Sequence, residues 1–73
     1  MKKDMSAVTC ARLASGMTIE DARSVVGLTY PPYKSREEDP SLFTVGELSR
    51  LTHSLNAEGR AIIKKWALSF FGL

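Results

Sequence analysis

Apolar residues recur at helical spacing along almost the whole of this 73-residue chain, and no segment alternates convincingly between apolar and polar residues. A chain of this length makes one domain at most and leaves no room for a large catalytic cleft. Its 44% hydrophobic and 25% charged residues are typical of a globular domain rather than a disordered or fibrous one. The pattern therefore predicts an all-α fold in a single domain, residues 1–73.

Start and stop signals divide the chain into five predicted helices. The clearest is a capping box in "TVGE", in which Thr44 and Glu47 cap each other's backbone, and Thr18 with Asp21 forms a weaker variant. Gly27 is expected to end the second helix. The predicted helices span residues 6–15, 19–26, 32–38, 45–55 and 57–71.

Prolines limit the third predicted helix on both sides. Because the residue before a proline is pushed out of the α region, Pro31 is expected to be extended and Pro32 to begin the helix, while Pro40 sets its other limit. The acidic run at residues 37–39 has the wrong sign for the negative end of a helix dipole. We expect this helix to be the least stable of the five.

The residues that usually carry chemistry are scarce. Cys10 is the only cysteine and His53 the only histidine, so neither an intramolecular disulfide nor the usual type of zinc site can form. The serines lack the context of a nucleophile elbow, and no glycine pattern suggests a phosphate loop. We therefore expect no enzyme activity, no catalytic residues, no metal and no cofactor.

The ends of the chain predict a cytoplasmic protein. Asp4 and Arg12 interrupt what would be the apolar part of a signal peptide, and the apolar C-terminal run "WALSFFGL" is far below the roughly 20 residues that span a bilayer. The basic, amphipathic C-terminal helix could lie on a membrane surface, but closing a small core is the stronger interpretation. Its aromatic end predicts a partner surface and a homodimer through this helix, formed by Trp66, Phe70, Phe71 and Leu73.

Two closely joined helices with a short third after "GLTYPP" have the spacing of a helix-turn-helix. A "P-x-x-F-T-x-x-E-L" segment follows, present as "PSLFTVGEL" at residues 40–48. On these features the chain over residues 7–56 resembles the Xre/Cro-type helix-turn-helix family of small phage and bacterial repressors. The resemblance implies a compact five-helix domain of the Cro/repressor type.

The family resemblance also implies a surface for double-stranded DNA. In that family the second helix packs on the DNA backbone and the third enters the major groove. Thr18 and Thr44 would each approach a phosphate at the start of a helix. The residues carried over as DNA-binding are Thr18, Thr29, Tyr30, Tyr33, Lys34, Arg36 and Thr44.

The sequence departs from the family pattern at several of these positions. Arg23 stands where the family prefers a small alanine against the third helix. That helix has no aliphatic anchor, so Tyr30 and Tyr33 serve either packing or base contact, and the sequence leaves both open. The acidic residues 37–39 would repel phosphates if they faced the duplex.

Two functions follow from these features. The first is a sequence-specific DNA-binding transcriptional regulator of the kind that phages and mobile elements encode, acting by occupancy. The alternative is a helix-turn-helix-shaped protein-interaction module, such as an antirepressor or phage-encoded inhibitor, that does not bind DNA. A shared exposed face for Arg23, Lys34 and Arg36 would favour DNA, whereas dominance of that face by the acids at residues 37–39 would favour a protein partner.

Overall fold

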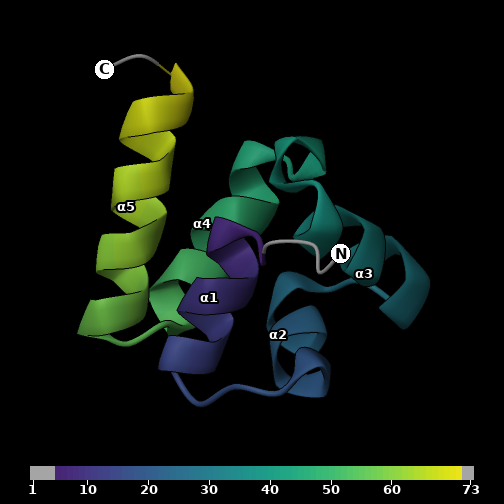
Figure 1. Cartoon of the computed structure of the whole chain (residues 1–73). Helices are drawn as coiled ribbons and strands as arrows, with labels where there is room; N and C mark the ends of the chain where they lie inside the picture. The colour runs from purple at the N-terminus through teal and green to yellow at the C-terminus, as the bar shows by residue number, and fades with distance from the viewer. Residues whose placement is uncertain (1–4, 72–73) are drawn as a thin grey trace.

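A computed structural model describes residues 5–71, apart from the side chains of residues 70 and 71. Helices and turns make up this part of the chain, and it contains no strand, which confirms the all-α prediction. Five α-helices and one short 3-10 helix follow one another as α1 (Ala7–Ala14), α2 (Ile19–Val26), α3 (Tyr30–Glu38), η1 (Pro40–Leu42), α4 (Val45–Ser54) and α5 (Ala57–Phe71) (Figure 1).

The helices form two packed groups around one core. The long helix α5 packs chiefly along α1, so the first and last helices lie side by side, while α2 packs against both α3 and α4. Contacts between α4 and α5 and between α1 and α3 join the two groups. Because α3 touches α1 and α2, its position depends on both.

All five α-helices contribute buried side chains to this core. Tyr33 and Leu51 are its largest fully buried members. Ile19, Phe43 and Ile62 pack against it from half-buried positions, in agreement with the sequence pattern. The buried cluster consists of Val8, Ala11, Ala22, Val26, Tyr33, Leu51, Leu55 and Ile63.

The helical spacing of the apolar residues also predicts Leu13 and Val25 in the core, but the structure shows both exposed. Val25 is 39% exposed and Leu13 is 51% exposed. On α2 the inward line runs through Ala22 and Val26, one turn apart, so Val25 is rotated about 100° away from it. The predicted core positions of Val25 and Leu13 are therefore wrong, because each lies on a different side of its helix from the buried residues.

Helix α3 begins at Tyr30, two residues before the predicted start at Pro32, and Pro31 is helical rather than extended. The first backbone hydrogen bond of this helix runs from Tyr33 N to Thr29 O, at 3.2 Å. Prolines in the first turn remove no bond from the helix, because the first N–H groups of a helix have no partner within it. The predicted end at Glu38 is confirmed.

The predicted caps are confirmed in the structure. In the α4 box, Thr44 N donates to Glu47 Oε1 at 3.0 Å, and Glu47 N donates to Thr44 Oγ1 at 3.1 Å. The weaker box of α2 also makes both of its bonds. Asn56 caps α5, because its Oδ1 accepts a hydrogen bond of 2.8 Å from Gly59 N.

Gly59 is buried where α5 passes closest to α1. A Cβ atom at this position would lie 2.8 Å from the Ala11 carbonyl oxygen and would also collide with Ser15 Oγ. The carbonyl belongs to helical backbone and cannot move without displacing α1. Glycine is therefore required here for the close approach of the two helices.

Replacing Gly59 with alanine should lower the free energy of unfolding by about 1–3 kcal/mol, the usual cost of overpacking. Gly46 provides a matched control on α4, because its added Cβ would meet only Arg50 Nη1, at an ordinary 3.7 Å. Gly46→Ala should raise the free energy of unfolding by up to about 1 kcal/mol, since alanine is the better helix former. Urea unfolding followed by circular dichroism measures both changes, and equal effects of the two replacements would contradict the close α1–α5 packing.

Candidate functional site

A tight turn connects α2 to α3 and sets the direction of α3. Gly27 closes α2 in the left-handed conformation, with φ of 89°, which favours glycine. Its N–H and that of Leu28 both donate to the Arg23 carbonyl, at 2.8 and 3.0 Å. Ala22 and Val26 of α2 belong to the same buried cluster as Tyr33 of α3. The two helices therefore form one packed unit. We call the side of α3 that faces away from this packing its outer side.

Tyr33 lies on the inner side of α3 and not on its outer side. It is fully buried, and its ring packs edge-on against Phe43 with 6.1 Å between the ring centroids. Burial first, and the neighbouring Glu37 carboxylate next, raise the pKa of its hydroxyl. Of the two roles that the sequence leaves open for Tyr33, the structure shows packing, so the expected DNA contact is wrong: this tyrosine is the anchor of a helix that has no aliphatic residue.

Thr29, Tyr30 and Lys34 lie on the accessible part of α3. Thr29 is exposed, Tyr30 is 46% exposed and Lys34 is half-buried. Lys34 Nζ lies 3.8 Å from Glu38 Oε2, one turn further along the helix. Residues four apart share one side of a helix, so Tyr30, Lys34 and Glu38 form one stripe.

Arg36 fastens α3 to α4 and does not join that stripe. Its Nε donates to Glu47 Oε1 at 2.9 Å, and its Nη1 donates to the Pro32 carbonyl at 3.2 Å. The same Glu47 oxygen accepts the capping bond from Thr44 N. The pKa of Glu47 lies below its ordinary value, chiefly because of that backbone hydrogen bond and then because of Arg36. Arg36 is thus a structural residue in this arrangement.

Arg23 is similarly occupied beside the turn. Its guanidinium donates to Glu20 Oε1 at 2.6 Å, and its Nη1 reaches the Leu28 carbonyl at 3.4 Å. Together with the pairs of Lys34 and Arg36, this means that each of the three cations has a carboxylate partner. They do not form the shared exposed face that would have favoured DNA.

The acidic run at residues 37–39 is divided between the interior and the surface. Glu37 is only 3% exposed, whereas Glu38 and Asp39 are exposed. Asp39 accepts hydrogen bonds from Ser41 N and Ser41 Oγ, at 3.3 and 2.7 Å. The acids therefore do not act as one cluster and do not dominate the outer side of α3.

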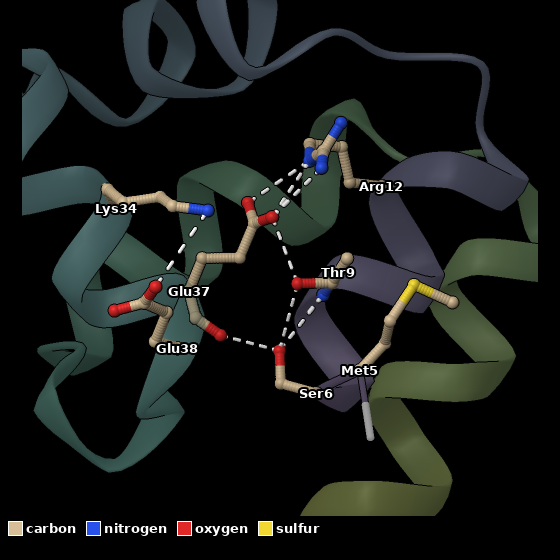
Figure 2. Close-up of a pocket in the computed structure, with 7 residues that line it drawn as sticks. All are labelled: Met5, Ser6, Thr9, Arg12, Lys34, Glu37 and Glu38. Carbon is tan, nitrogen blue, oxygen red and sulfur yellow. Dashed lines mark hydrogen bonds and ion pairs between the residues drawn. The ribbon is translucent and has the colours of Figure 1, made fainter. Parts of the chain in front are cut away.

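The interior partner of Glu37 is Arg12 of α1, a pair that the sequence analysis did not predict. Arg12 is 8% exposed and binds both Glu37 carboxylate oxygens through Nε at 3.1 Å, with a further contact of 2.9 Å from Nη2 (Figure 2). Thr9 Oγ1 donates to the same carboxylate at 2.9 Å. Arg12 Nη1 also donates to the Met17 carbonyl, at 3.0 Å. The pair joins α1, the α1–α2 loop and α3.

Two features of the sequence could have indicated this pair. Arg12 lies one turn after Val8 and next to Ala11, on the side of α1 that is otherwise apolar and buried. Glu37 lies one turn after Tyr33, on the inner side of α3. A charge on each inner face indicates a buried ion pair, since neither is tolerated alone.

Opposing effects set the pKa of Glu37. Burial is the largest single effect and disfavours the charged carboxylate, but the hydrogen bonds to it, led by that from Arg12, and the Arg12 charge together hold the pKa of Glu37 below its ordinary value. Glu37 is therefore ionised near neutral pH and binds Arg12 as a carboxylate.

A cavity of about 220 Å³ lies over this ion pair, lined from α1 and α3 (Figure 2). Its charged groups are paired with each other, Arg12 with Glu37 and Lys34 with Glu38. Within residues 5–71, no cluster of His, Cys, Asp and Glu side chains could hold a metal ion. The same part of the chain contains no helix long and apolar enough to cross a membrane.

The two remaining predicted DNA contacts lie at helix starts. Thr18 and Thr44 are exposed and cap α2 and α4. In the predicted partner surface, Trp66 is half-buried on α5. The side chains of Phe70 and Phe71, and the whole of Leu73, lie outside the described residues, so the homodimer stays a prediction.

Comparison with known proteins identifies no relative: none of the family models, curated proteins or solved structures compared with this chain matches it. The resemblance to the Xre/Cro-type family therefore stays a prediction from the residues.

A double-mutant cycle should show strong coupling between Arg12 and Glu37. Arg12→Met and Glu37→Leu alone should each lower the free energy of unfolding by about 3–5 kcal/mol, because each leaves a buried charge unpaired. The double variant should lose less free energy of unfolding than the two single losses added together, because neither buried charge remains. Urea unfolding provides the four values, and additivity of the two single effects would contradict a coupled buried pair.

The lowered pKa of Glu37 predicts an acid-sensitive contribution to stability. That contribution is present above the unfolded-state pKa of about 4.3 and is lost as pH falls through the lower folded-state pKa. The free energy of unfolding should therefore fall more steeply towards pH 3 in the parent chain than in the double variant, which keeps all other carboxylates. Parallel pH profiles of the two proteins would contradict this role for Glu37.

Proposed function

We propose that this protein binds double-stranded DNA as a helix-turn-helix transcriptional regulator, with α3 entering the major groove. One observation carries the proposal: α2, the Gly27 turn and α3 form a packed unit that buries Tyr33 and leaves Thr29 and Tyr30 exposed and Lys34 half-exposed at the edge of the cavity beside α1. A short helix presented in this way is the element that helix-turn-helix proteins place in the groove.

The starts of α2 and α4 supply the phosphate contacts in this proposal. Each begins with an exposed threonine, Thr18 or Thr44, in a formed capping box. First-turn N–H groups that the helix does not use can bond a phosphate oxygen, and the helix dipole favours that charge. Such contacts would position α3 without reading sequence.

Lys34 is the cation best placed to neutralise a phosphate. Its pair with Glu38 spans 3.8 Å, and the two side chains are 43% and 57% exposed. An exposed pair of this length contributes little to stability, so a phosphate can replace Glu38 at low cost. Arg23 and Arg36 instead hold the turn and the α3–α4 junction together. The protein would bind DNA with few ionic contacts and a shallow dependence on salt.

A second candidate function is a protein-interaction module that does not bind DNA. The observation in its favour is that Arg23, Lys34 and Arg36 all have carboxylate partners within the chain. Non-specific affinity for DNA depends on cations that can contact phosphate, and a cation that is paired with a carboxylate is less available for this. The two candidates differ in whether the folded protein binds a duplex at low salt.

Removing Lys34 should weaken binding to all duplexes and reduce the log–log slope of affinity against salt by about one unit. Lys64→Ala removes an equal charge from an exposed position of α5 and should leave the slope unchanged. Fluorescence anisotropy with a labelled random duplex at several salt concentrations measures both. Folded parent protein that binds no duplex even at low salt would refute DNA binding and favour the interaction module.

A further inference from the structure

The side chains that usually read bases by paired hydrogen bonds are missing from the outer side of α3. Asparagine and glutamine read adenine in this way, and arginine reads guanine. The chain contains no glutamine, and its one asparagine, Asn56, caps α5 and donates to the Ala14 carbonyl at 3.0 Å. Arg23 and Arg36 are bound to Glu20 and Glu47. Direct readout on this chain therefore needs another chemistry.

The outer side of α3 presents mostly apolar groups at its exposed start. Tyr30 is 46% exposed, and Thr29 and Pro31 beside it are also exposed. These residues offer an aromatic ring, a proline ring and a threonine methyl group. Pro31 has no N–H to donate, and its ring fixes the backbone at this point. The side chains of this surface are apolar apart from the hydroxyls of Thr29 and Tyr30.

One base edge in the major groove matches such a surface. The 5-methyl group of thymine is the only apolar group that the four bases present there, and it is read by apolar contact. Cytosine, uracil and the purines lack it. An apolar surface next to the groove floor would therefore distinguish thymine from all of these.

We propose that the surface formed by Thr29, Tyr30 and Pro31 recognises the 5-methyl group of pyrimidines, so that this protein selects DNA rich in thymine. The inference rests on the proposed binding of α3 in the major groove. Lys34, one turn further along the stripe, contacts phosphate and contributes affinity that does not depend on the methyl group. Each methyl group that is contacted should increase affinity about fourfold, the factor that corresponds to burial of one such group.

Paired duplexes that differ only in this methyl group provide the test. One pair is alternating A·T against the same duplex with uracil in place of thymine, and the other is alternating G·C with 5-methylcytosine or with cytosine. The parent protein should bind the methylated member of each pair more tightly. Tyr30→Ala should reduce both differences, whereas Lys34→Ala should weaken binding to all four duplexes and keep the differences.

Tyr30 lies on the surface, and circular dichroism checks that its variant is folded. Pro31→Ala is a second variant at an exposed position and should also reduce the preference. Equal affinity of the parent protein for the two members of each pair, with salt-dependent binding retained, would overturn methyl recognition and leave the proposed function intact. No binding to any of the four duplexes at low salt would overturn both.

Discussion

The buried ion pair between Arg12 and Glu37 fixes the position of α3, and the outer surface of that helix depends on it. A charge left alone in this interior would be costly, so α3 can neither tilt nor slide on α1 without breaking the pair. Tyr33 anchors the same helix one turn earlier, and Arg36 binds it to α4 through Glu47. These contacts hold in place a helix that has two prolines in its first turn and two glutamates at its end.

Local features of the fold could be predicted from the sequence, and features that depend on tertiary contact could not. A capping box joins residues three apart in the chain, so the pairing of Thr44 with Glu47 could be predicted directly from the sequence. The ion pair joins residues 25 apart in the chain, and its acid stood in a run that resembled a solvated helix end. The phase of α2 decided the error at Val25, since one step along a helix turns a side chain by about 100°.

The same distinction applies to the candidate site. Sequence reasoning named Tyr30 and Tyr33 together, and only packing separates an exposed ring from a buried one. The sequence shows the cations but not their partners: in the structure Arg36 pairs with Glu47 and Lys34 with Glu38. Each of the three cations in and beside α3 that the DNA prediction used has a carboxylate partner. Shape and apolar contact take a larger share of recognition in this account than charge does.

Mapping the bound surface by nuclear magnetic resonance tests the central claim most directly. Uniformly ¹⁵N-labelled protein would be titrated at low salt with an unlabelled A·T-rich duplex. The account predicts amide shift changes at the starts of α2, α3 and α4, centred on Tyr30 and Lys34, with little change along α5. Changes confined to α5, or no changes in a folded protein, would contradict a DNA-binding role for α3.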